Sequence, residues 1–322
     1  MSILVYTEAE NGKLKKNAFE AASYAYKVAG EMGTEVTAIS FNVSDNSDLG
    51  KYGVSKVLKV EDEKLKTFHA RAYASAISEA VKKTGAQVVI LSSSTDSKYL
   101  GGLLAGMLKA GYVPNAVAAP DSVQPMVVKR MAFSNKGFAH TEVNTDIKII
   151  GVSNNAFGII ENSSSLQEET FSPEAGEKDF TTRSVEVDKV VGEVTIADAD
   201  IVVSAGRGLK GPENWGMIEE LAEVLGAATA CSKPVSDMGW RSHGEHVGQT
   251  GKPVASNLYI AIGISGAIQH LAGVSASKVK VVINTDPEAP FFKAADYGIV
   301  GDAFEVVPKL IEKLKEFKAQ NA

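Results

Sequence analysis

The sequence has a single cysteine, Cys231, among 322 residues, which excludes an internal disulfide framework. It also has no apolar run approaching the roughly 20 residues that a membrane-spanning helix needs. The first residues, MSILVYTEAE, carry neither the basic stretch nor the long apolar stretch of a secretory signal. We therefore expect a protein without direct membrane insertion that works in the reducing cytoplasm.

Positive charge is scarce as well, and it is scattered along the chain. The 33 Lys and Arg residues are outnumbered by 39 Asp and Glu residues, which gives a formal net charge of -6. Because surfaces that bind nucleic acid concentrate Lys and Arg, we expect no nucleic-acid partner. Aromatic residues make up only 7% of the chain, whereas hydrophobic residues reach 44%, a composition typical of globular α/β proteins with small side chains in packed layers.

What the first half does contain is an alternation of apolar strand candidates with amphipathic helix candidates. At about 150 residues per domain, the chain length predicts two domains. Such alternation predicts an α/β fold whose mostly parallel sheet is covered by helices on both faces. The candidates are, in order, residues 3–6, 17–32, 35–41, 54–60, 68–83, 88–91 and 99–108.

The pattern changes in the middle of the chain. Short alternating runs at 126–131, 140–143 and 147–152 predict antiparallel strands that finish the first domain. Residues 161–179 are rich in Ser, Glu, Gly and Pro, which is the composition of a surface linker, and an extended arm follows at 183–191. We place the boundary between an N-terminal α/β domain, residues 1–192, and a C-terminal domain, residues 193–322.

Two polar clusters have both a structural and a functional interpretation. The hydroxyl-rich run at 92–95 follows a strand, so it could contact a ligand at the edge of the sheet or cap a helix through Thr95 or Asp96. His243 and His246 lie in a loop with several acids, but no third ligand of defined geometry is in view. We therefore expect no metal site there.

A glycine turn marks the start of the second domain. The strand candidate at 201–204 runs directly into Ala205-Gly206-Arg207-Gly208, and a helix candidate follows at 214–225. A turn between a strand and a helix offers backbone N–H groups to an anion, and a guanidinium can bind phosphate bidentately. The pattern predicts a phosphate contact at Arg207, although an exposed arginine in a tight turn would look the same.

The stretch VGQTGKPVASNLYIAIGISGAIQH, residues 247–270, holds two further turns around one strand. A glycine-bracketed polar turn at 248–251 precedes a buried strand candidate at 258–262, and a second turn at 263–266 opens into a short helix that carries His270. Backbone N–H groups and small residues at such a joint allow an anion to approach closely. The sequence predicts a nucleotide-like ligand.

These motifs together resemble the alpha subunit of electron transfer flavoprotein. The resemblance is carried by VSAGRGLKGPEN (203–214), VGQTGK (247–252), LYIAIGISGAIQHLAG (258–273), INTDPEAPFFKAADYGIVGD (283–302) and EVVPKLIEKL (305–314). It implies that residues 193–322 form a doubly wound, parallel-sheet domain that binds FAD. It further implies a heterodimer with a beta subunit that holds AMP or, in bifurcating members, a second FAD.

The resemblance also implies a role in electron transport. Such a chain would accept electrons from acyl-CoA dehydrogenases or other dehydrogenases and pass them to a membrane or soluble oxidoreductase, such as a quinone-linked one. By the same resemblance, the residues that contact FAD would be Arg207, Ser232, Lys233, Val247, Gly248, Gln249, Thr250, Ser265, Gly266, Ala267, Ile268, Gln269, His270, Asn284, Asp302 and Ala303.

Parts of this set have distinct expected tasks. Ser265 and Gly266 would hold the pyrophosphate, while Gln249 and Thr250 would contact the O4 and N5 edge of the flavin. His270 would face the N1–C2=O edge, where a hydrogen-bond donor or an imidazolium stabilises the negative charge that arises on reduction.

One departure from the family pattern is Ser232-Lys233, where the family commonly has Ser-Arg. Lysine keeps the positive charge but loses the planar stacking of a guanidinium, so the flavin potential could differ. A further hypothesis is that His243 and His246 supply part of the positive field.

Two other functions remain open from the residues alone, an NAD-dependent dehydrogenase and a non-enzymatic nucleotide-binding sensor. A dehydrogenase needs a GxGxxG-type turn with an acidic residue about 20 positions later, and neither glycine turn completes that pattern. No Ser/His/Asp or Cys/His set is recognisable, so we expect no independent bond-making catalysis.

Overall fold

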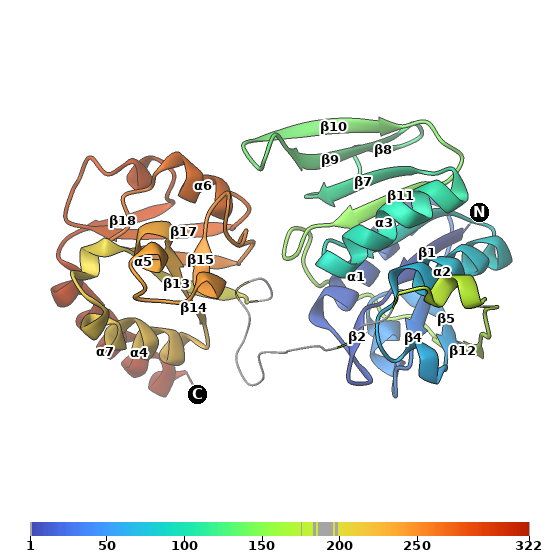
Figure 1. The fold of residues 1–322 in the computed structure, drawn as a ribbon, viewed down its shortest axis with the longest axis horizontal. Coiled ribbons are helices and arrows are strands. Elements are labelled where there is room, and N and C mark those ends of the chain that lie inside the picture. Colours follow the sequence, from blue (N-terminus) through green and yellow to red (C-terminus); the bar gives the residue numbers. More distant parts are fainter. Residues whose placement is uncertain (1, 175, 183–184, 186–195, 197–198, 322) are drawn as a thin grey trace. The chain divides into compact units, whose positions relative to one another are not determined.

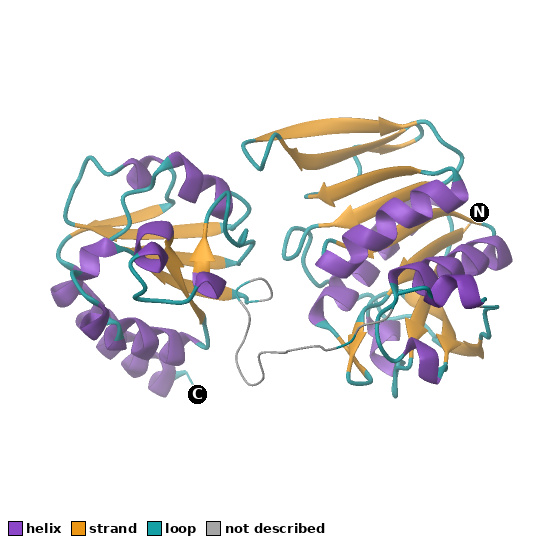
Figure 2. Ribbon diagram, viewed as in Figure 1, coloured by secondary structure: helices purple, strands orange, loops and turns teal. Residues whose placement is uncertain are grey.

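The computed structural model describes the chain except for residues 1, 175, 183–184, 186–195, 197–198 and 322. The chain forms two compact units, the first holding β1 to β12 and the second β13 to α7 (Figure 1). Both are α/β, which confirms the predicted fold class, and Figure 2 shows helices packed around the strands of each unit. The predicted boundary at 192/193 lies outside the described residues, and so does most of the predicted arm at 183–191.

The first unit is built on a ten-stranded sheet with the order β10-β9-β7-β11-β6-β1-β4-β5-β12, and β8 pairs with β9. The strands from β12 to β7 run parallel to their neighbours, whereas β9 runs antiparallel to β7 and β8. The strands are β1 (Ser2–Tyr6), β4 (Val36–Phe41), β5 (Val54–Val60), β6 (Ala86–Ser92), β7 (Gly111–Ala116), β8 (Ser122–Val123), β9 (Met126–Ala132), β10 (Gly137–Val143), β11 (Lys148–Val152) and β12 (Gln167–Thr170); β2 (Ala9–Glu10) and β3 (Lys13–Leu14) form a separate hairpin.

Helices cover both faces of this sheet because the strand side chains alternate between two buried layers. Ile3 and Val5 of β1 pack in the layer under α1 (Lys16–Met32). Leu4 and Tyr6 point the other way, into the layer under α2 (Ala70–Thr84) and α3 (Thr95–Leu108). None of the described helices combines the length and apolarity that crossing a membrane requires.

The structure corrects two expectations for the middle of the chain. Strand β11, which we expected to be antiparallel, lies between β6 and β7 and runs parallel to both. Its sequence KIIGV is almost entirely buried, as expected of a central parallel strand. The expected linker at 161–179 contains β12, which extends the sheet in parallel beside β5, and a 3-10 helix at Glu177–Phe180.

Three serine hydroxyls at and after the end of β6 make structural contacts. Ser94 caps α3 by accepting a hydrogen bond from Ser97 N, so the cap lies one residue before the predicted Thr95. The hydroxyls of Ser92, Ser94 and Ser97 donate to the buried carboxylate of Glu8. These three hydroxyls are therefore satisfied within the protein, whereas the Oγ of Ser93 is buried and has no hydrogen-bond partner among the described residues.

The second unit has a six-stranded sheet with the order β15-β14-β13-β16-β17-β18, and every neighbouring pair is parallel. The chain starts in the middle at β13, winds outward to β15, and returns to build the other half from β16. This is the predicted doubly wound arrangement, with its switch point between β13 and β16. The strands are β13 (Ile201–Ala205), β14 (Ala228–Ser232), β15 (His246–Val247), β16 (Leu258–Ile262), β17 (Val279–Asn284) and β18 (Tyr297–Val300).

The helices of this unit are α4 (Gly216–Leu225), α5 (Lys233–Asp237), α6 (Ile268–Val274) and α7 (Ala303–Gln320). Helices α4 and α7 pack beside each other over one face of the sheet (Figure 1). Pro308 lies inside α7 and not at its first position. Asp302 sets the start, since its side chain accepts a hydrogen bond from Phe304 N at 3.0 Å.

Candidate functional site

A cavity of about 800 Å³ opens at the carboxyl ends of the parallel strands of the second unit. The residues that end or follow four neighbouring strands line it, namely Arg207 after β13, Ser232 at the end of β14, Ser265 after β16 and Asn284 at the end of β17. Open α/β sheets bind ligands at this edge, next to the switch point. The volume also lies within the range typical of small-molecule sites.

The cavity brings together most of the residues predicted to contact FAD. Those that line it are Arg207, Ser232, Lys233, Val247, Gly248, Gln249, Thr250, Ser265, Ala267, Gln269, His270 and Asn284. The set of predicted FAD contacts did not include the other lining residues, which are Gly208, Pro234, Asp237, His246, Gly263, Ile264 and Asp286. Their adjacency to the predicted turns was the signal that could have found them.

The remaining predicted contacts, Gly266, Ile268, Asp302 and Ala303, do not line this cavity. Gly266 has a φ of +87°, and a Cβ there would lie 2.4 Å from the backbone nitrogen of Phe291, so the turn requires glycine. Asp302 caps α7, and its carboxylate lies 3.8 Å from Lys210 Nζ. Contacts of these four residues with FAD stay predictions.

The two glycine turns that follow β13 and β16 pack backbone against backbone. Gly208 N donates a hydrogen bond to Gly263 O at 3.1 Å. A Cβ on Gly206 would lie 2.2 Å from the same oxygen, and a Cβ on Gly208 would lie 2.6 Å from Gly263 Cα. Only residues without a side chain allow this approach, which places both turns at one mouth of the cavity.

Hydrogen-bond donors in this region are left without protein acceptors. Within the described part of the chain, the backbone N–H groups of Ser265, Gly266 and Ala267 make no hydrogen bond. Arg207 is exposed and forms no ion pair with any described carboxylate. Because helix α6 has only seven residues, these donors, more than the helix dipole, would attract an anion to the turn.

The positive charge of Lys233 is partly neutralised by a neighbour. Its Nζ lies 2.9 Å from Asp237 Oδ1, and both side chains line the cavity. The lysine that replaces the family arginine therefore belongs to an ion pair at the rim. Because both side chains are about half exposed, we expect water to screen this pair.

His246 is a lining residue that the sequence left without a contact role, and it is only 7% exposed. Burial lowers the pKa of this histidine from its ordinary value, and the positive charge of Lys233 lowers it further. The shift favours the neutral imidazole, so it does not support the hypothesis that His246 supplies positive charge. His243 contacts the hydroxyl of Ser236 through Nδ1 at 2.8 Å.

His270 is 6% exposed and reaches the cavity from the first turn of α6. Its Nε2 lies 2.9 Å from the hydroxyl of Tyr259. Burial, and secondarily the nearby His246, lowers the pKa of His270 to about 4, although the backbone of Val247 opposes this shift. Without a ligand, this pKa favours a neutral imidazole at pH 7, which can still donate one hydrogen bond.

These features fit FAD. The unpaired N–H groups at 265–267 and Arg207 would hold the pyrophosphate, while the turn at 248–251 and His270 would face the flavin ring. The Nδ1 atom of His270 is buried and has no hydrogen-bond partner among the described residues, so it is available to form a hydrogen bond with a bound ligand. Bound FAD would supply reversible uptake and release of electrons.

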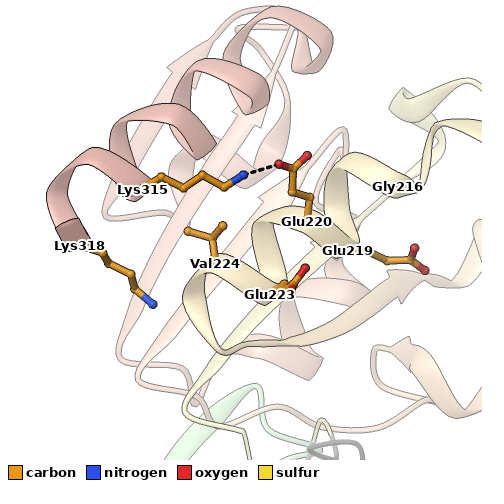
Figure 3. A pocket seen from close by; sticks show the side chains of 7 residues that line it. All are labelled: Gly216, Glu219, Glu220, Glu223, Val224, Lys315 and Lys318. Atoms are coloured by element: carbon orange, nitrogen blue, oxygen red, sulfur yellow. Dashed lines mark hydrogen bonds and ion pairs between the residues drawn. The ribbon is translucent and has the colours of Figure 1, made fainter. Parts of the chain in front are cut away.

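A second hollow lies between α4 and α7 (Figure 3) and contains none of the predicted contacts. Its acids are mostly paired, since Glu220 binds Lys315 at 2.7 Å and Glu219 binds Arg241 at 3.0 Å. An acid-rich, charge-paired groove does not suit a phosphate ligand. In the described ranges, no three His, Cys, Asp or Glu side chains gather to hold a metal ion.

Two family models of known proteins match the chain. The family model described as "Electron transfer flavoprotein domain" matches residues 3–190, and the model described as "Electron transfer flavoprotein FAD-binding domain" matches residues 195–275. These matches do not favour the dehydrogenase or the sensor that the sequence left open.

Curated relatives resemble the chain over nearly its whole length. It is 38% identical to the electron transfer flavoprotein subunit alpha of Bacillus subtilis, covering 98% of this chain and 97% of the relative. The corresponding subunit of Thermoanaerobacterium thermosaccharolyticum is 36% identical, with 98% of each chain covered. The mitochondrial subunit of Dictyostelium discoideum is 58% identical over 123 residues, which cover 38% of this chain and 35% of that protein. The chain therefore belongs to the electron transfer flavoprotein family as an alpha subunit, a protein that binds FAD and transfers electrons.

Proposed function

We propose that this chain pairs with an electron transfer flavoprotein beta subunit and holds FAD in the cavity of its second unit. The heterodimer would accept electrons from acyl-CoA dehydrogenases or other dehydrogenases and deliver them to a membrane or soluble oxidoreductase, such as a quinone-linked one. One observation carries the proposal, namely that the turns after β13 and β16 place unpaired donors and His270 around a single cavity. We propose the cytoplasm as its location.

Each group of lining residues would have a separate task. Arg207 and the N–H groups of Ser265 and Ala267 would bind the pyrophosphate through charge-assisted hydrogen bonds. Gln249 and Thr250, which are exposed at the tip of their turn, would bind the polar edge of the flavin. Asn284 would act by bracing the site, since its Nδ2 donates to Ile264 O at 3.1 Å and its Oδ1 accepts from Asp286 N at 3.0 Å.

Co-expression with a beta subunit tests the cofactor and the pairing together. We expect a yellow heterodimer with one flavin per alpha subunit, identified by its visible spectrum and by chromatography of the released nucleotides. One FAD with one AMP, or two FAD, would distinguish the two kinds of beta subunit. A colourless heterodimer that takes up no added FAD would refute the proposal.

The proposed donors require a separate test. The purified heterodimer is mixed with an acyl-CoA dehydrogenase and its acyl-CoA substrate under anaerobic conditions. Bleaching of the flavin absorbance that depends on both additions would support this donor class. If the flavin is bleached only by a different dehydrogenase with its own substrate, that dehydrogenase is the donor. Addition of a quinone oxidoreductase should then reoxidise the flavin and restore its absorbance.

A further inference from the structure

Tyr259 and His270 form a buried polar pair behind the cavity. Tyr259, on β16, is 0% exposed, and its hydroxyl lies 2.9 Å from His270 Nε2. The ring of Phe291 lies parallel to that of Tyr259 at a centroid distance of 6.3 Å, and it also lies near the imidazole. Because Tyr259 does not line the cavity, it can act on a ligand only through His270.

The protonation of the two rings limits how this hydrogen bond is made. Burial raises the pKa of Tyr259 above its usual range, so the hydroxyl keeps its proton. A neutral imidazole carries its one proton on either nitrogen, and the partner of one nitrogen determines the choice.

The surroundings of His270 favour a proton on Nδ1. With Nε2 occupied by the Tyr259 hydroxyl, the other ring nitrogen is the one left for further contacts. Nδ1 is buried and makes no hydrogen bond to any described residue, and His270 lines the cavity, so Nδ1 is the ring nitrogen available to a ligand. If the Tyr259 hydroxyl donates to Nε2, the proton of the neutral imidazole is on Nδ1.

We propose that Tyr259 is a positioning residue whose hydroxyl donates to Nε2 of His270 and thereby keeps the imidazole proton on Nδ1, as a donor for the ligand in the cavity. The inference rests on the proposed function, in which that ligand is FAD. An Nδ1–H favours negative charge at the neighbouring flavin edge, whereas a lone pair at the same place would repel it.

The tautomer can be measured directly in the FAD-loaded heterodimer labelled with 15N-histidine. The chain has only five histidines, and His270→Gln identifies the signals of His270 by their loss. We expect Nδ1 to be protonated and Nε2 to be unprotonated in the parent protein. Tyr259→Phe removes the hydroxyl with little change of shape, and we expect it to populate the Nε2–H form.

Tyr24→Phe is the matched control. Tyr24 lies in the first unit, and its hydroxyl is buried without a hydrogen-bond partner among the described residues. The Tyr24→Phe variant should therefore give the same His270 signals as the parent protein. If Tyr259→Phe does not fold, the 15N spectrum of the parent protein still tests the proposal. A proton on Nε2 of His270 in the parent protein would overturn it.

The flavin midpoint potential gives a second readout. Tyr259→Phe should lower it by most of the shift that His270→Gln produces, and the double variant should show no further decrease. An unchanged tautomer and an unchanged potential in Tyr259→Phe, with FAD fully bound, would overturn the role of Tyr259 alone. Absence of bound FAD from the parent heterodimer would count against the proposed function instead.

Discussion

Arg207 brings an unpaired positive charge to the cavity, since Lys233 is held by Asp237 and no described carboxylate pairs with Arg207. If Arg207 binds the pyrophosphate, Arg207→Met keeps the unbranched stem of the side chain but loses a charge-assisted contact. Such contacts contribute about 1.5–3 kcal/mol, so we expect FAD affinity to fall roughly 10- to 100-fold. Quenching of flavin fluorescence during titration of the apoprotein measures this.

Lys309→Met is a suitable control for the Arg207 variant. Lys309 is exposed on α7, and its removal changes the net charge by the same amount. Equal losses of FAD affinity in both variants would mean that only the net charge of the protein affects FAD binding and that Arg207 does not contact the ligand.

Gly206 tests the close approach of the two turns. In Gly206→Ala the new Cβ would lie 2.2 Å from Gly263 O, so the backbone must shift. Overpacking of this kind costs about 1–3 kcal/mol, which denaturant unfolding should show as a lower midpoint. Gly216→Ala, at a helix position with no atom within 4 Å of the new Cβ, should be neutral or slightly stabilising.

His270 makes the stability of the apoprotein depend on pH. Its folded pKa of about 4 lies below the ordinary value of 6.5, so the unfolded chain binds more protons between these values. Stability should therefore be complete above pH 6.5 and fall as the pH drops toward 4, by about 3 kcal/mol. His246, whose pKa is also lowered, acts in the same direction.

Denaturant unfolding at several pH values between 7 and 4 would test this dependence. His270→Gln should make the loss of stability in this window smaller without removing it, because His246 remains. An identical pH dependence in the variant and the parent would show that the His270 pKa is not lowered.

At the scale of elements, Glu20 of α1 fixes the loop that follows β11. Its buried carboxylate accepts hydrogen bonds from the backbone N–H groups of Asn155, Phe157 and Gly158 at 2.7, 2.9 and 2.8 Å. Glu20→Ala leaves these donors without that acceptor, and we expect a loss of about 3 kcal/mol in unfolding free energy. Faster hydrogen exchange at the three amides would localise the effect.

The same helix offers a control for the Glu20 variant. Glu31 forms a surface ion pair with Lys27 at 3.0 Å, and such pairs contribute only about 0.5 kcal/mol. If Glu31→Ala destabilised the protein as much as Glu20→Ala, helix charge and not the loop contacts would be responsible.

At the scale of the whole molecule, each unit has buried layers of its own on both faces of its sheet. We therefore expect calorimetry to resolve separate transitions, with added FAD raising only the one that belongs to the second unit. At a ligand concentration of 100 times Kd, the stabilisation is about 2.7 kcal/mol. A uniform shift of all transitions would contradict independent unfolding of the units.

The sequence by itself determined the α/β class, the doubly wound second sheet and the family. Apolar runs such as 201–204 and 258–262 are followed by glycine turns, so local pattern alone defined the strand ends where the cavity lies. The motifs also supplied most of the residues that line the cavity. Whether each of them touches FAD stays a prediction.

Only the tertiary structure decided features that depend on distant neighbours. Strand β11 runs parallel because β6 and β7 flank it, and β12 joins the sheet because β5 leaves an edge open for it, although its own residues are mostly polar. The charge state of His270 depends on its burial beside Tyr259 and His246, which no local pattern shows. Local sequence thus determined where strands and turns begin, whereas pairing, burial and protonation followed from long-range packing.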